Sequence, residues 1–132
     1  MIYLASAYSH DEPAVRQERY EQAMTACVVL TRAGEHVHSS IVHWHPASVA
    51  YNLRGDYGFW QRYNWEMIEL CANMFVLNTP DWELSTGVKD EIDHAQCCRK
   101  PIHLFTLSTG ALDELWMPAE RPTKISVNMK KA

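Results

Sequence analysis

Segments with strand character alternate with longer segments of helical periodicity along this chain, and that alternation limits the folds it can adopt. The predicted strands are residues 2–5, 36–42, 74–77 and 102–105. The predicted helices are residues 11–33, 57–71 and 85–99. Strands that alternate with helices build parallel βαβ units, so the pattern predicts an α/β fold.

The expected architecture is a Rossmann-like three-layer sandwich around a mainly parallel sheet of four to five strands. Ligands of such sheets bind outside the carboxyl ends of the strands. Four segments gather on that rim of the predicted sheet: residues 6–10, residues 43–56 with room for a short helix, residues 78–86 and the loop after residue 105. Functional residues are therefore expected in these segments.

The length of the chain predicts how many domains it has, and its net charge argues against some classes of partner. The 132 residues fit one domain, predicted at residues 1–110, with residues 111–132 as a C-terminal arm or tail. That arm carries a short strand-like piece at residues 124–127 and is expected to be frayed or packed on a partner subunit. A net charge of -4 argues against a nucleic-acid polymer or an anionic membrane as partner, because both need a basic stripe.

The compartment is predicted from the cysteines and the apolar runs. None of the four cysteines has C-x-x-C spacing, which favours reduced thiols in a cytoplasmic protein over a disulfide framework. No apolar run is long enough to span a bilayer, and the N-terminus lacks the pattern of a signal peptide. A cytoplasmic protein without a membrane partner is therefore expected.

The strongest local signal is the segment TPDWELSTGVKDEIDHA, which follows a predicted strand. Asp81 lies in the loop, Ser85 occupies an N-cap position, and Gly87 and Glu91 share one helix face. The free N–H groups of such a helix start attract an anion, and a small residue at 87 would let a ligand approach the backbone. The alternative is an ordinary capped helix whose acidic side chains are solvated.

Two further rim segments supply candidate ligand contacts. The first is YLASAYS, where small residues permit close approach of a ligand, although it lacks the G-x-G-x-x-G pattern of a dinucleotide site. The second is DYGFWQRYNW, in which Asp56 and Trp60 are candidates for contacting a base or sugar. A tight turn, an N-cap at Asp56 and aromatic core packing are the competing interpretations.

Four histidines, at positions 36, 38, 43 and 45, occur in pairs two residues apart. On a strand, this spacing points both side chains of a pair to one face. No cysteine pair or third ligand accompanies them at a recognisable spacing, so no metal site is predicted. His43 is instead expected to line the rim pocket.

Together, YLASAYS at the N-terminus, the long helix after it and S-T-G-V-K-D-E-I resemble the nucleoside 2-deoxyribosyltransferase-like superfamily, in particular its small bacterial and phage branch of unknown function. The resemblance covers residues 1–106. In that superfamily the first strand ends in Y-x-A-G-P-hydrophobic, and the catalytic Glu follows a Gly by four residues. Here the corresponding residues are Tyr3, Ser6 and Ala7, and then Gly87 and Glu91.

The resemblance implies that Glu91 is the nucleophile attacking C1′ of a (deoxy)ribosyl group, in an N-glycosidase or 2-deoxyribosyltransferase-like enzyme that needs no cofactor. Its place near a helix start is expected to keep the carboxylate ionised. Ser85, six residues before Glu91, favours a nucleoside 5′-monophosphate, because a hydroxyl there binds a phosphate that a carboxylate would repel. The substrate-binding residues implied or expected on the rim are Tyr3, Ser6, Tyr8, Ser9, Arg19 (or Arg16), His43, Asp56, Trp60, Asp81, Ser85 and Gly87.

The chain departs from the superfamily pattern at several positions, which leaves other functions open. Ser6-Ala7 replaces Gly-Pro, and Asn64 and Asn73 stand where the superfamily often has Asp. An Asn orients a base but cannot give it a proton. A catalytically silent nucleotide-binding protein and an oligomeric interaction module are therefore the alternatives. The resemblance further implies a homodimer or higher homo-oligomer.

Overall fold

A four-stranded parallel sheet forms the centre of the computed structural model, which describes residues 1–108 and 111–112. Its strands are β1 (Ile2–Ala5), β2 (Val37–His38), β3 (Asn73–Leu77) and β4 (Ile102–Phe105). Their order across the sheet is β2-β1-β3-β4, and every neighbouring pair is parallel. The predicted α/β fold is confirmed.

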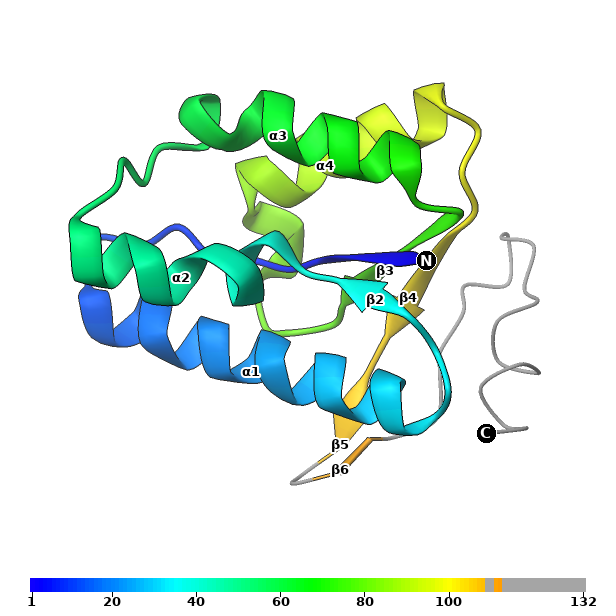
Figure 1. Cartoon of the computed structure of the whole chain (residues 1–132), viewed down its shortest axis with the longest axis horizontal. Coiled ribbons are helices and arrows are strands. Elements are labelled where there is room, and N and C mark those ends of the chain that lie inside the picture. Colours follow the sequence, from blue (N-terminus) through cyan, green and yellow to red (C-terminus); the bar gives the residue numbers. More distant parts are fainter. Residues whose placement is uncertain (109–110, 113–132) are drawn as a thin grey trace.

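Helices cover both faces of the sheet, with α1 (Pro13–Arg32) on one side and α3 (Tyr57–Leu70) and α4 (Thr86–Cys97) on the other (Figure 1). Successive strand side chains point to opposite faces. Ile2 and Leu4 therefore join the core cluster beneath α1, whereas Tyr3 and Ala5 join the cluster beneath α3 and α4. This alternation places a tyrosine of the central strand against the helix that carries Glu91.

The helix ends follow the signals expected from the sequence. Pro13 opens α1, and Gly34 follows its end with φ of +89°, a conformation that glycine adopts without strain. Asp56 caps α3 by accepting a hydrogen bond from the backbone N–H of Phe59, and Ser85 caps α4 by accepting one from Val88. These caps fix where the two site-bearing helices begin.

The segment after β1 and α1 differs from the sequence-based expectation. The strand predicted at residues 36–42 has only two residues, and helix α2 (Ser40–Tyr51) follows at once. Ser39 initiates this helix, because its side chain accepts a hydrogen bond from Val42 N at 3.1 Å. The paired-strand spacing proposed for the histidines is therefore wrong for residues 43 and 45, which lie on α2 beside α1 (Figure 1).

Beyond β4, strands β5 (Leu107–Ser108) and β6 (Ala111–Leu112) pair in antiparallel fashion. The first two residues of the predicted C-terminal arm thus extend the chain past the sheet as part of this pair. The remainder of that arm, with the strand predicted at residues 124–127, lies outside the described residues. All four cysteines are free, as expected. Within the described ranges, no helix has the length and apolar character needed to cross a membrane.

Candidate active site

Glu91 lies on α4 with its side chain buried between the helix layer and the sheet. Only 6% of the residue is exposed. The Tyr3 hydroxyl, from β1, donates to Oε2 at 3.1 Å, and the Asn64 side-chain amide, from α3, donates to the same oxygen at 3.0 Å. Three elements of the fold therefore converge on one carboxyl group.

The pKa of this carboxyl differs from the sequence-based expectation. Burial raises the pKa of Glu91 from 4.5 to about 8, and the hydrogen bond from Tyr3 opposes that rise without cancelling it. The expectation that the helix start keeps Glu91 ionised is therefore wrong for the ligand-free protein, because desolvation outweighs it. At neutral pH, most of the population holds a proton on this carboxyl.

Glu91 lines a cavity of about 80 Å³, called the inner cavity below, which shares part of its lining with a wider groove of about 910 Å³, called the outer groove. Of the residues predicted from the sequence, the cavity is lined by Ser6, Tyr8, Ser9, Trp60, Ser85, Gly87 and Glu91. Asp56 lines the outer groove only, together with Arg16. The rim loops after β1 and β3 thus meet where the strand order reverses, the place where open α/β sheets bind ligands.

Several polar atoms of the cavity residues lack hydrogen-bond partners within the described part of the chain. They are Ser6 Oγ, Asn64 Oδ1 and Trp44 Nε1. Ser6 and Asn64 are 8% and 5% exposed, so water does not satisfy them freely. Because buried polar groups are nearly always paired, these atoms are available to hydrogen-bond with a polar molecule in the cavity, whether water or a ligand.

The start of α4 presents hydrogen-bond donors. Ser85 Oγ accepts the cap hydrogen bond from Val88 N at 3.2 Å, which leaves its hydroxyl proton free to donate outward. The first N–H groups of a helix have no intrahelical acceptor, and they carry partial positive charge. Ser85, Thr86, Ser9 and Arg16 all line the outer groove.

The absence of a side chain at Gly87 has a packing role that the sequence did not reveal. A Cβ at this position would lie 3.0 Å from Cδ1 and 3.2 Å from Cε1 of Tyr57. The space beside the helix start is thus filled by the Tyr57 ring, so the glycine serves the packing of α3 on α4. Gly87 also lines the cavity and the groove, so the approach of a ligand to its backbone stays a prediction.

Tyr57 is held in place by an acidic neighbour of Glu91. Its hydroxyl donates to Asp90 Oδ2 at 2.8 Å, and the Trp65 indole N–H donates to the same oxygen at 2.8 Å. Burial, with the nearby carboxylates Glu91 and Asp90, raises the pKa of Tyr57. Tyr57 is therefore a neutral phenol at all physiological pH values.

His45 forms a second fixed polar wall of the cavity. Its Nδ1 lies 2.6 Å from the Tyr8 hydroxyl and its Nε2 lies 2.9 Å from Gln17 Oε1, while Tyr20 stacks on the ring at 4.4 Å. Burial lowers the pKa of His45, which favours the neutral ring. In that state Nε2–H donates to Gln17 and Nδ1 accepts from Tyr8, so the Tyr8 oxygen is available to accept a hydrogen bond from a ligand.

Four predicted site residues line neither the inner cavity nor the outer groove. Tyr3 is buried and donates a hydrogen bond to Glu91. Arg19 donates to the Ser9 backbone carbonyl at 2.8 Å. His43 is exposed on α2, and Asp81 is exposed before the short 3-10 helix η1 (Trp82–Leu84). Arg19 therefore supports the Ser9 loop from outside the cavity.

The substrate-binding residues predicted from the sequence did not include Tyr57, Asn64, Trp44 or His45, all of which line the cavity, although Asn64 was noted as a departure from the superfamily pattern. Asn64 had a readable signal, because it falls on the same face of its helix as buried Ile68. His45 and Trp44 had none, since their segment was expected to be a loop. Trp44 and Trp60 face each other across 5.5 Å between ring centroids.

Comparison with known proteins agrees with this architecture. The family model described as "Domain of unknown function (DUF1937)" matches residues 1–107. No curated protein matches the chain. A solved 2-deoxyribosyltransferase from the psychrotolerant bacterium Bacillus psychrosaccharolyticus superposes with a TM-score of 0.54 at 22% identity, covering 85% of this chain and 76% of that one. The resemblance to the nucleoside 2-deoxyribosyltransferase-like superfamily is thereby confirmed in the fold.

Proposed function

This chain belongs to the DUF1937 family of domains of unknown function, and from that premise we propose that it cleaves the N-glycosidic bond of a nucleoside 5′-monophosphate, with Glu91 as nucleophile. The observation that carries the proposal is a buried carboxyl that lines the cavity and is oriented by Tyr3 and Asn64. The shared fold with a 2-deoxyribosyltransferase supports the same chemistry.

In the proposed reaction, the ionised Glu91 carboxylate attacks C1′ of the sugar, and the C1′–N bond breaks with its electron pair passing to the base. A glycosyl ester of Glu91 forms, and water or a second base then attacks C1′ and releases the carboxylate. The leaving base must gain one proton. Asn64 cannot give this proton, and the ionised Glu91 has none to give, so the proton comes from solvent. Glu91, whose pKa is raised by burial, first loses its own proton to solvent to become the nucleophile.

The remaining parts of the substrate are assigned by the chemistry of the lining. The 5′-phosphate would lie in the outer groove, between the Ser85 helix start and Arg16. The base would lie against Trp44 and Trp60, which offer flat apolar surfaces. Asn64 Oδ1 and Ser6 Oγ, which have no hydrogen-bond partner within the described residues, would then hydrogen-bond to the base or sugar.

The proposal is tested by incubating the protein with a panel of ribonucleoside and deoxyribonucleoside monophosphates and measuring free base by chromatography. Wild type should release base from at least one of them, and Glu91→Gln should release none. Glu66→Gln is the matched control, because Glu66 is an exposed glutamate on α3. If Glu91→Gln released as much base as wild type, Glu91 would not be the nucleophile.

A catalytically silent nucleotide-binding protein is the second candidate. The observation that favours it is the pKa of about 8, which leaves Glu91 mostly protonated at neutral pH unless a ligand changes its surroundings. Calorimetry separates the two candidates: tight nucleotide binding without base release supports the silent protein. A ligand at about 100 times its dissociation constant should add about 2.7 kcal/mol of stability in either case.

We further propose a cytoplasmic homodimer or higher homo-oligomer, with residues 1–110 as the domain and the residues after it as an arm. Exposed apolar side chains beside the outer groove support an interface there: Val49 is 68% exposed and Leu84 is 73% exposed. Light scattering of the full chain tests the oligomer. A monomer would contradict the proposed assembly, whereas an oligomer that binds no nucleotide would instead favour an interaction module.

A further inference from the structure

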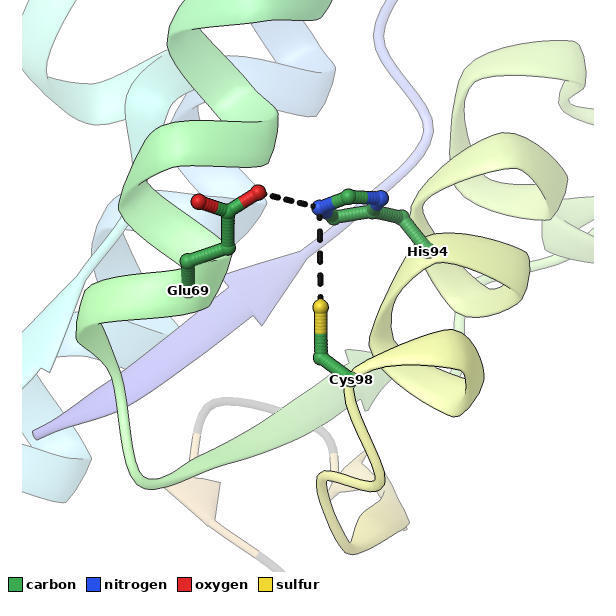
Figure 2. A group of neighbouring side chains, drawn as sticks. All are labelled: Glu69, His94 and Cys98. Atoms are coloured by element: carbon green, nitrogen blue, oxygen red, sulfur yellow. Dashed lines mark hydrogen bonds and ion pairs between the residues drawn. The ribbon is translucent and has the colours of Figure 1, made fainter.

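A second group of potential ligand atoms lies outside the cavity, at the carboxyl ends of α3 and α4 (Figure 2). It consists of Glu69 on α3 and of His94 and Cys98 at the end of α4. One carboxylate oxygen, one ring nitrogen and the thiol sulfur lie within 4.8 Å of one another. His94 Nε2 is the common point, 2.8 Å from Glu69 Oε2 and 3.7 Å from Cys98 Sγ.

We propose that Glu69, His94 and Cys98 bind a divalent cation of the Zn²⁺ class. With ordinary Zn–N, Zn–O and Zn–S bond lengths, a tetrahedral site separates N from S by about 3.5 Å and N from O by about 3.4 Å. The N–S separation of 3.7 Å is already close to that value. The N–O separation of 2.8 Å needs only a modest turn of the exposed Glu69 side chain to admit the ion.

The ring of His94 is held in the orientation that the site needs. The Trp65 indole stacks on it, with 4.5 Å between centroids and an interplanar angle of 5°. Trp65 is itself anchored, because its N–H donates to Asp90 Oδ2. Lys100 Nζ donates to the Glu69 backbone carbonyl at 3.0 Å and so ties the ends of the two helices together.

The carboxyl ends of the two helices favour a cation, against the opposing charge of Lys100. The carboxyl end of a helix carries partial negative charge, and α3 and α4 both end beside the three ligands. The spacing of His94 and Cys98, four residues apart, points both toward one side of α4. Two ligands from one helix and one from its neighbour therefore converge with little rearrangement.

The ligand set selects the type of ion. A thiolate and an imidazole suit Zn²⁺ and similar ions, whereas Mg²⁺ and Ca²⁺ prefer oxygen ligands alone. Three protein ligands leave the fourth tetrahedral position to water or to another ligand. The metal replaces the thiol proton of Cys98, so one proton leaves per bound ion and binding weakens as the pH falls.

The site is separate from the proposed chemistry at Glu91, since none of its three ligands lines the inner cavity or the outer groove. Its test therefore needs no activity. The full chain, freed of metal with a chelator under reducing conditions, is titrated with Co²⁺ as a coloured substitute for Zn²⁺. One equivalent should produce a thiolate-to-cobalt charge-transfer absorption that an equivalent of Zn²⁺ then removes.

Cys97 supplies a matched control, because it is the adjacent cysteine on the same helix and is exposed. Cys98→Ser should abolish the charge-transfer absorption, whereas Cys97→Ser should keep it. His94→Gln and Glu69→Gln should weaken Zn²⁺ binding at least tenfold, with circular dichroism confirming that each variant is folded. No charge-transfer absorption in wild type, or its loss in Cys97→Ser with retention in Cys98→Ser, would overturn the proposal.

Discussion

The Tyr3 hydroxyl donates a 3.1 Å hydrogen bond to Oε2 of Glu91, and this bond joins strand β1 to helix α4. Both residues are buried. Burial raises the pKa of Glu91, and this hydrogen bond, the largest opposing contribution, lowers it. Tyr3 thus favours the ionised form that a nucleophile needs.

The variant Tyr3→Phe should raise the pKa of Glu91 further above its wild-type value of about 8. A hydrogen bond to a charged group contributes about 1.5–3 kcal/mol, so its loss should move the titration up by about one pH unit or more. Carbon-13 NMR of the Glu91 side-chain carboxyl measures this directly in the ligand-free protein. A titration midpoint at or below that of wild type would show that Tyr3 does not stabilise the charge.

Replacing Glu91 should stabilise the protein at alkaline pH. The unfolded chain ionises Glu91 near 4.5, but the folded protein does so only near 8. The stability associated with this group is therefore fully present below pH 4.5, is lost as the pH rises to 8, and stays low above it. The upper bound on that loss is on the order of 5 kcal/mol.

Glu91→Gln keeps the shape of the side chain and removes the charge, so its melting temperature should exceed that of wild type most clearly at pH 8–9. The advantage should shrink toward pH 5. The exposed Glu66→Gln serves as control and should show no such pH dependence. A Gln variant that is less stable than wild type at every pH would contradict the cost assigned to the buried carboxylate.

Gly87→Ala should destabilise the protein, because the new Cβ would press on the Tyr57 ring at 3.0 Å. Overpacking of this kind costs about 1–3 kcal/mol, which outweighs the gain in helix propensity. Gly58→Ala is the matched control in the first turn of α3. Its Cβ would meet only Asp56 Oδ2 at an ordinary 3.5 Å, so it should be neutral or stabilising.

Urea denaturation of both glycine variants gives the comparison. Gly87→Ala should lower the free energy of unfolding less in a Tyr57→Ala background than in wild type, because the ring that the new Cβ would contact is absent there. Equal stability of Gly87→Ala and Gly58→Ala would rule out the packing explanation for the glycine.

Ser85→Asp should distinguish the role of Ser85 in capping α4 from its proposed role in binding a phosphate. Asp caps helices about as well as Ser, so the melting temperature should change little. A carboxylate at the helix start would repel a phosphate, so binding of nucleoside monophosphates should weaken at least tenfold, while binding of free nucleosides should not. Unchanged monophosphate affinity in a folded Ser85→Asp variant would show that the phosphate does not bind beside Ser85.

The order of strands and helices was predictable because most elements carry a clear local pattern, a short apolar run for a strand or helical periodicity for a helix. Segment 36–51 was not, since Ile41 and Val42 are β-branched and Pro46 lies within the segment. Their propensities favour a strand and then a loop. The Ser39 cap and the burial of His45 beside α1 outweigh them, which only the three-dimensional packing reveals.

In the candidate site, the residues on α4 were predictable from one helix face, because Gly87 and Glu91 are local neighbours. The surroundings of Glu91 were not, since Tyr3 and Asn64 reach it from 88 and 27 residues away. The ionisation of Glu91 was misjudged for the same reason. Desolvation is set by everything that covers a side chain, whereas the sequence shows only its own helix.

The central claim is that the Glu91 carboxylate becomes covalently bonded to C1′ of the sugar. A nucleoside monophosphate that carries fluorine at C2′ destabilises the positive charge on the sugar and slows breakdown of such an ester. Once the panel has identified a substrate, its fluorinated analogue is incubated with the protein, which is then digested and mapped by mass spectrometry. The account predicts a sugar phosphate on the peptide containing Glu91, and none in Glu91→Gln. Release of base without any adduct on Glu91, or an adduct on another side chain, would contradict it.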